Sequence, residues 1–324
     1  MDKVGFTTSI PVEIILAAGK IPVDLNNIFI TSEKARQLVD VAEDAGYPRN
    51  TCGWIKGLYA VALENDLQSV IAVMHGDCSN TQALMETLQL KNIDIIPFAY
   101  PFDRDKESLR GQMDKLIKIF QVDWKSVNRV KTNLDRIRGL CREIDLMTWH
   151  DNLVSGWENH YYLVSSSDFN GDPVQYEQDL LSFISQARSR KPYQDKVRLA
   201  YIGVPPIFTD LYNVLESMGA RVVYNEVQRQ FSMPFDTNDI VEQYCQYTYP
   251  YGAFARLEDI QDQIALRKVD GIIHYTQTFC FRQIEDIIYR QKIKLPFLTL
   301  EGDKPGKMDA RSRMRLEAFV SMLK

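Results

Sequence analysis

The segment VRLAYIGVPPIFTDLYNVLESMGARVVYNEV (residues 197–227) decides the fold class. Two apolar runs rich in β-branched residues, 197–204 and 220–227, flank a stretch with helical spacing at 208–219. A strand–helix–strand unit of this kind joins parallel strands through a right-handed crossover. Gly219 stands where the helix must end and turn into the second strand. The segment therefore predicts a parallel sheet covered by helices.

The same alternation continues to the C-terminus and recurs, more loosely, in the first half. Further strands are expected at 269–276 and 295–302, and in the first half at 20–26, 69–75 and 93–100. Helical spacing is found at 12–19, 53–66, 80–91, 256–268 and 282–292. We therefore predict an α/β protein with two doubly wound domains.

A long charged region with helical spacing separates the two α/β units. It runs from 106 to about 147 and resumes at 175–188. The segment SRKPYQDK (189–196) is charged, contains a proline and lacks periodicity, which is typical of a linker. We expect an N-terminal α/β domain that binds the cofactor, a helical insert with the linker, and a C-terminal α/β domain, at residues 1–105, 106–190 and 191–324.

The composition excludes several classes of protein. The 324 residues are 45% hydrophobic and 25% charged, as in ordinary globular proteins. The net charge of −5 offers no basic excess to neutralise nucleic-acid phosphates. No apolar run reaches the roughly 18 residues of a membrane span, and the N-terminal segment lacks the features of a signal peptide. We expect a cytoplasmic protein without a nucleic-acid or membrane partner.

The cysteines are few and widely spaced, which excludes a disulfide framework. The chain has five of them and no CxxC pair. The ordinary role of a free cysteine is that of a small core residue. The five lie at positions 52, 78, 141, 245 and 280.

Three of the cysteines share an unusual local context. Cys52 lies at the start of an amphipathic helix, with Asn50 or Thr51 expected as its N-cap. Cys78 and Cys280 each lie between a buried strand and a helix. Helix N-termini carry free N–H groups and partial positive charge, which lower a thiol pKa and favour anionic ligands.

Cys78 and Cys280 also follow the carboxyl ends of expected parallel strands, where open α/β sheets bind ligands. With Cys52, they would suit a [4Fe–4S] cluster that has three protein ligands and an open fourth iron. The wide spacing alone leaves core packing as an equally good explanation. Cys141, on an apolar helix face, and Cys245, near a helix end, are expected in the core.

A series of motifs resembles those of the 2-hydroxyacyl-CoA dehydratase family of the D-component type, which includes the benzoyl-CoA reductase subunits. The opening TTSIPVEIILAAGKIPVDL (7–25) is similar to the start of the family. GDCSNT (76–81) and TFCFRQIEDI (278–287) resemble its second and third cysteine motifs. The similarity keeps the family order over nearly the whole chain and continues through VRLAYIGVPP, MGARVVYNE, YTYPYGAFAR and ARSRMRLEAF.

The resemblance implies two domains with four-stranded parallel sheets and a [4Fe–4S] cluster on Cys52, Cys78 and Cys280. It also implies a lyase with two kinds of partner: a homologous subunit, in a homo- or heterodimer, and an ATP-dependent iron–sulfur activator protein. In the family, the activator injects one electron, the acyl-CoA thioester becomes a ketyl radical anion, and the 2-hydroxyl group leaves. The chain has no GxxxxGK[ST] or GxGxxG loop of its own, so the electron must come from outside.

Two other functions remain open within the resemblance. One is an ATP-dependent reductase of the benzoyl-CoA reductase or double-cubane type, and the other is a non-catalytic partner subunit that binds a cluster. A double cubane needs more thiolates than the chain offers once Cys141 and Cys245 are assigned to the core. Typical family members are longer, so insertions that cover the substrate are expected to be missing.

Several other polar residues lie near the expected site. Thr7, Thr8 and Ser9 precede the first helix, where N-capping is the ordinary role. The resemblance makes Ser9 or Thr8 a candidate catalytic hydroxyl that faces the substrate. His75 and His274 lie near Cys78 and Cys280 and could donate to a cluster sulfide, although a core role is more common.

The segment MTWHDNLVSGWENHYYLV (147–164) carries His150 and His160. A surface or interface role fits this segment as well as a catalytic one does. We expect Tyr247, Tyr249 and Tyr251 to pack a turn rather than bind a ligand.

Overall fold

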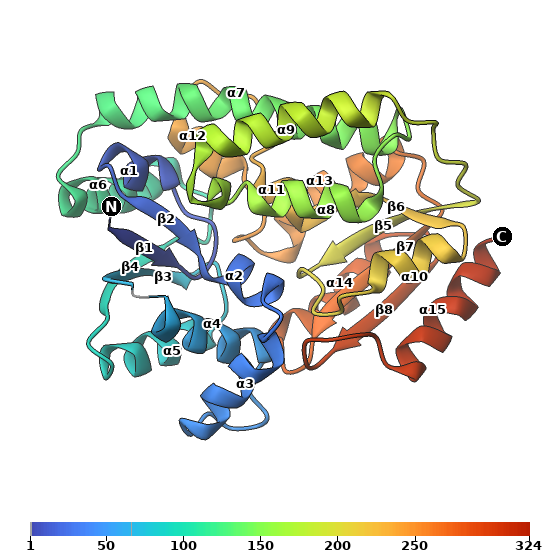
Figure 1. Cartoon of the computed structure of the whole chain (residues 1–324), viewed down its shortest axis with the longest axis horizontal. Coiled ribbons are helices and arrows are strands. Elements are labelled where there is room, and N and C mark those ends of the chain that lie inside the picture. The colour runs from blue at the N-terminus through green and yellow to red at the C-terminus, as the bar shows by residue number, and fades with distance from the viewer. Residues whose placement is uncertain (1, 66) are drawn as a thin grey trace.

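The computed structural model describes residues 2–65 and 67–324, and these form two four-stranded parallel sheets (Figure 1). The first sheet has the order β2 (Ile21–Asp24), β1 (Lys3–Phe6), β3 (Ser69–His75), β4 (Asp94–Ala99). The second has the order β6 (Ala220–Asn225), β5 (Val197–Gly203), β7 (Gly271–Gln277), β8 (Phe297–Gly302). All neighbouring strands are parallel, so the predicted α/β fold with two doubly wound sheets is confirmed.

The strands of the second half lie where the apolar runs predict them. β1 was not located by periodicity, because its four residues, KVGF, are too few to show an alternation. It is nevertheless a central strand of its sheet, paired on one side with β2 and on the other with β3.

Helices surround the two sheets. Those of the first half are α1 (Val12–Ala17), α2 (Leu25–Thr31), α3 (Ala35–Asp44), α4 (Gly53–Glu64) and α5 (Asn80–Gln89). Those of the second half are α10 (Leu211–Ser217), α11 (Glu226–Phe231), α12 (Ile240–Gln246), α13 (Ala253–Leu266), η2 (Phe281–Gln283), α14 (Glu285–Lys292) and α15 (Ala310–Leu323). The sequence pattern did not single out α2 and α3.

Between the sheets in sequence lie α6 (Lys106–Phe120), α7 (Trp124–Trp149), α8 (Gly156–Ser165), η1 (Phe169–Gly171) and α9 (Pro173–Arg188). A side chain caps the start of each of them: Asp105 caps α6, Asp123 caps α7, Ser155 caps α8, Asp168 caps η1, and Asp172 caps α9. In Figure 1, α7, α8 and α9 run together across the top of the molecule, over both sheets.

The long helix α7 is bound to both halves of the chain by buried ion pairs. Arg138 donates to Glu13 of α1 at 2.8 Å. Asp145, two turns further on, accepts from Arg267, at the end of α13, at 2.5 Å. These charged groups are almost completely buried, so removing one partner of either pair would leave an unpaired buried charge between α7 and that half of the chain.

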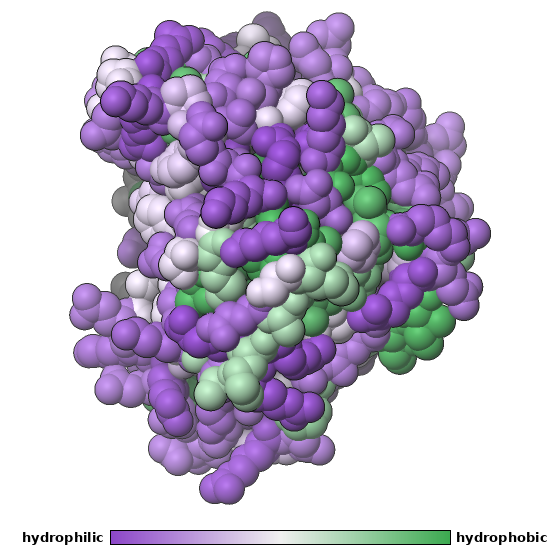
Figure 2. Space-filling view, turned by 90° about the vertical axis from the view of Figure 1, so that its right-hand side faces the viewer, coloured by the Kyte–Doolittle hydropathy of each residue, from purple (hydrophilic) through white to green (hydrophobic). Residues whose placement is uncertain are grey.

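The outer face of the C-terminal half is mostly hydrophilic and is crossed by a narrow apolar band (Figure 2). Exposed apolar side chains of this half include Ile284 and Ile287 near α14, and Met314 and Met322 on α15. In the described part of the chain, no helix combines the length and apolarity needed to cross a membrane.

Candidate functional site

One pocket lies where the carboxyl ends of both sheets meet. In each sheet the chain reverses its direction of winding between the two central strands, β1 and β3 or β5 and β7. Residues just after all four of these strands line the pocket: Thr8 after β1, Cys78 after β3, Val204 after β5 and Cys280 after β7. Open α/β sheets bind ligands at this reversal point, and here two such points face each other.

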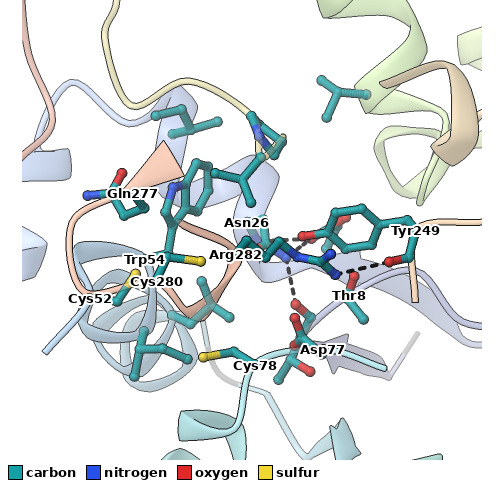
Figure 3. Close-up of a pocket in the computed structure, with 18 of the residues that line it drawn as sticks. Thr8, Asn26, Cys52, Trp54, Asp77, Cys78, Tyr249, Gln277, Cys280 and Arg282 are labelled. Atoms are coloured by element: carbon teal, nitrogen blue, oxygen red, sulfur yellow. Dashed lines mark hydrogen bonds between the residues drawn. The ribbon is translucent and has the colours of Figure 1, made fainter. Parts of the chain in front are cut away.

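Three cysteine thiols surround the same space in this pocket (Figure 3). Cys52 is itself the N-cap residue of α4, so the expected capping by Asn50 or Thr51 is wrong. Cys78 lies two residues before α5, and its Sγ accepts from the backbone N–H of Asn80 at 3.4 Å. Cys280 is the N-cap residue of η2. Three segments far apart in sequence therefore bring their thiols into one pocket, whose volume is about 80 Å³.

The thiol pKa values are raised, which contradicts the expectation from helix N-termini. Burial raises the pKa of Cys52 and of Cys78 to about 12, and it also raises the pKa of Cys280. Backbone N–H groups near each sulfur lower these pKa values, but their effect is smaller than that of burial. Without a bound cation, the three thiols are therefore protonated at neutral pH, and a metal would have to displace the protons.

A buried arginine holds the segment that carries Cys280. Arg282 donates to Glu285 at 3.1 Å and to the backbone oxygen of Tyr249 at 3.0 Å. Glu285 also accepts from Arg256 at 2.9 Å, so the segment is fixed from two sides. Arg282 and Asp77 both line the pocket (Figure 3). Burial raises the pKa of Asp77 to about 6, while the positive charge of Arg282 opposes this rise.

The hydroxyl groups before α1 have different surroundings. Thr8 lines the pocket, whereas Ser9 is buried outside the residues that line it. The Thr7 hydroxyl accepts from the backbone N–H of Val73 at 3.1 Å and so joins β1 to β3. The N-cap residue of α1 is Pro11, and no side chain caps the helix. The N-capping interpretation of Thr7, Thr8 and Ser9 is therefore wrong.

The remaining histidine and cysteine candidates lie outside the pocket. His274 is buried, and its Nδ1 lies 2.8 Å from an oxygen of Asp286. His75 hydrogen-bonds a backbone carbonyl oxygen and lines a separate cavity. Cys141 and Cys245 are buried among apolar residues, so their predicted core role is confirmed.

The pocket also contains residues that the sequence did not assign to it. Asp24, Asn26 and Asn27 reach it from the junction of β2 and α2, Trp54 from the first turn of α4, and His160 from α8. The sequence did offer one signal for the first three: an Asp close to the end of an expected strand is a typical helix N-cap. In the structure, Asp24 is the N-cap of α2, and its side chain accepts from the Asn26 backbone N–H at 2.9 Å. His160 gave no such signal, because α8 showed no clear apolar spacing.

A comparison with family models gives one match over almost the whole chain. The model described as 2-hydroxyglutaryl-CoA dehydratase, D-component, matches residues 7–323. No curated protein matches the sequence significantly. The family match begins just after β1 and covers the other seven strands, the helices between the sheets and every residue of the three-cysteine pocket. The chain therefore belongs to the 2-hydroxyglutaryl-CoA dehydratase D-component family.

Proposed function

We propose that the chain is the iron–sulfur component of a 2-hydroxyacyl-CoA dehydratase-like enzyme, which dehydrates an acyl-CoA thioester by a radical route after ATP-driven one-electron activation. Membership of a family of dehydratase components supports a lyase that acts on acyl-CoA thioesters. The observation that carries the finer proposal is the meeting of Cys52, Cys78 and Cys280 in one pocket between the two sheets.

The donor set fits a [4Fe–4S] cluster. Thiolates are the usual protein ligands of iron in such clusters, and three of them would leave the fourth iron open for substrate. In residues 2–65 and 67–324, no three His, Cys, Asp or Glu side chains converge on one point as a single metal ion requires. A cubane takes one thiolate per iron, so its ligands stand around the cluster rather than around one point. We propose Cys52, Cys78 and Cys280 as its ligands.

The other pocket residues have roles that follow from their contacts. When bound, the cluster would supply the single electron that the dehydration needs. Arg282 would hold the Cys280 segment in place and offset negative charge in the buried pocket. Of the two hydroxyl candidates, Thr8 is better placed to face a substrate than Ser9, because only Thr8 lines the pocket. We propose Thr8 as the substrate-facing hydroxyl.

We propose two protein partners, a homologous subunit and an ATP-dependent iron–sulfur activator. Exposed apolar side chains directly follow Cys280: Phe281, Ile284 and Ile287 are 42%, 70% and 61% exposed. Electron transfer requires a short distance, so an activator that covered these side chains would dock beside the cluster. The sequence has no nucleotide-binding loop that would let the chain hydrolyse ATP itself.

The experiment is a dehydration assay without oxygen. The purified protein is mixed with a family activator, ATP, a strong reductant and 2-hydroxyglutaryl-CoA or an aliphatic 2-hydroxyacyl-CoA. We expect an enoyl-CoA product, and we expect its formation to stop when ATP is omitted. Turnover with dithionite alone would overturn the activation step. Reduction of benzoyl-CoA under the same conditions, with no dehydration, would identify a reductase instead.

A further inference from the structure

A much larger groove adjoins the three-cysteine pocket. We call this cavity the α8 groove; β2 and α2 form one of its walls and α8 forms the other. Its volume is about 690 Å³, within the range of about 300–1,000 Å³ for ligand pockets. Asn27, Ile30, His160 and Val164 line both cavities. These shared residues place the groove next to the cysteines, within reach of a ligand whose reactive end lies at the three-cysteine pocket.

Residues of an edge strand line the groove. β2 is the outer strand of the first sheet, and Ile21, Pro22 and Val23 line the groove. Lys3, which pairs with Ile21 at the far end of the strand from the pocket, also lines it. With a rise of about 3.3 Å per residue, the strand spans about 10 Å from Ile21 to Asp24. This course suits a linear chain better than a compact group.

The lining offers apolar surface and neutral hydrogen-bonding groups. On α8, Trp157 and Tyr161 stack with ring centroids 5.4 Å apart, at the side of the groove. Amide side chains come from Asn27, Asn65 and Asn170. Such a lining can hold methylene groups against the rings and pair with amide groups of a ligand.

The groove carries little charge. Among the described residues that line it, Lys3 is the only Lys or Arg. Burial lowers the pKa of His160 to about 4, so this side chain is neutral at pH 7. The Nδ1 atom of His160 lies 2.8 Å from the amide nitrogen of Gln228, which leaves Nε2 to carry the ring proton. A polyanion would find almost no compensating positive charge in the groove. An uncharged chain can enter it at a small cost in desolvation free energy.

We propose that the α8 groove binds the pantetheine arm of the acyl-CoA thioester, with the phosphates outside it. The inference rests on the proposed function, because it places the thioester at the three-cysteine pocket. Pantetheine is linear and uncharged and carries two amide groups, a hydroxyl and two methyl groups, which matches the lining. His160 and Asn27, which line both cavities, are donors at the thioester end of the arm.

The test uses the full chain, prepared without oxygen, and thioesters that cannot be dehydrated. Binding of butanoyl-CoA, butanoyl-pantetheine and butanoyl-N-acetylcysteamine is measured by isothermal titration calorimetry. We expect butanoyl-pantetheine to bind within about threefold of butanoyl-CoA, because the phosphates contribute little. The N-acetylcysteamine thioester, which lacks most of the arm, should bind at least about tenfold more weakly.

Two tryptophan substitutions locate the arm. Thr31→Trp places a large side chain at an exposed position on the groove wall and should raise the Kd of butanoyl-pantetheine at least about tenfold. Gln37→Trp, at an exposed position on α3 away from the groove, is the matched control and should leave the Kd unchanged. Iron content and visible absorbance, measured on the same samples, should be equal in both variants.

The two ways of failing are distinct. If the wild type binds butanoyl-CoA but Thr31→Trp binds it as well as Gln37→Trp does, the pantetheine arm lies elsewhere and the inference is wrong, while the proposed function stands. Equal binding of butanoyl-N-acetylcysteamine and butanoyl-pantetheine would likewise show that the inference is wrong, while the proposed function stands. If a cluster-loaded wild type binds none of the three thioesters, both the inference and the proposed function are overturned.

Discussion

Asp168 and Asp24 bring two buried carboxyl groups together where η1 meets the end of β2. The backbone N–H of Asp24 donates to Asp168 at 2.8 Å, and the Ser167 hydroxyl donates to Asp24 at 2.6 Å. Burial, together with the negative charge of Asp24, raises the pKa of Asp168 to about 7. The pKa of Asp24 is also raised by burial. At neutral pH, one proton is therefore partly retained by the pair.

The raised pKa of Asp168 makes the stability of the protein depend on pH. Because the folded state holds a proton that the unfolded state has lost, stability falls as pH rises from about 4 to about 7. Asp168→Asn should remove most of this dependence. The free energy of unfolding in urea is measured at pH 5 and at pH 8. Between these pH values, the wild type should lose at least about 1 kcal/mol more than Asp168→Asn does. Parallel stability curves for the two proteins would contradict the assignment.

At the scale of elements, α2 and α4 pack closely because α4 carries a glycine at the contact. A Cβ atom on Gly57 would lie 2.3 Å from the ring of Phe29, which is on α2. The same ring makes an edge contact with Trp54, at 5.3 Å between centroids, next to Cys52. The contact therefore helps to fix the first turn of α4, which carries one of the three thiols.

Alanine substitutions at two helical glycines test this packing. Gly57→Ala should destabilise the protein by about 1–3 kcal/mol, because the ring of Phe29 must move. Gly111→Ala, in α6, is the control, since its Cβ would meet no atom within 4 Å. It should stabilise the protein by about 0.5–1 kcal/mol through helix propensity. Thermal unfolding of both variants measures the difference, and equal shifts would contradict the packing argument.

Elements with a long regular pattern could be predicted from the sequence. β5 and β7 are buried apolar runs and β8 is a partly buried one, each bounded by helices, so their positions follow from local composition. α8 could not be predicted: its ten residues, GWENHYYLVS, mix aromatic and polar side chains, because they face several neighbours rather than one core. The segment around α8, for which a surface or interface role fitted as well as a catalytic one, thus lines the three-cysteine pocket and the α8 groove.

The candidate site could be predicted only where its residues carry a local signal in the sequence. The starts of helices mark Cys52, Cys78 and Cys280 in the sequence, and these residues do line one pocket. The direction of their pKa shifts could not be predicted, because burial comes from the packing of both domains and outweighs the local helix termini. The role of His160 stayed open between surface, interface and catalysis for the same reason, since only the tertiary fold brings α8 to the pocket.

At the scale of the whole molecule, α7 links the two halves through buried ion pairs. Asp145→Asn removes the charge that compensates Arg267, which is 2% exposed. We expect a loss of about 3–5 kcal/mol, because an unpaired buried charge remains. Glu143→Gln, on the same helix, breaks an exposed pair with Arg188 and should change stability by less than about 1 kcal/mol. Urea unfolding measures both, and similar small losses would show that the pair does not hold the halves together.

The central claim is that Cys52, Cys78 and Cys280 together hold a [4Fe–4S] cluster. The most direct measurement is the iron and acid-labile sulfide content of protein purified without oxygen. The wild type and Cys141→Ser should each hold about four iron atoms and about four sulfides per chain. Serine at 52, 78 or 280 should lower both values sharply, because a hard oxygen ligand suits these clusters poorly. Zinc in place of iron, metal-free protein after reconstitution, or an equal loss in Cys141→Ser would contradict the claim.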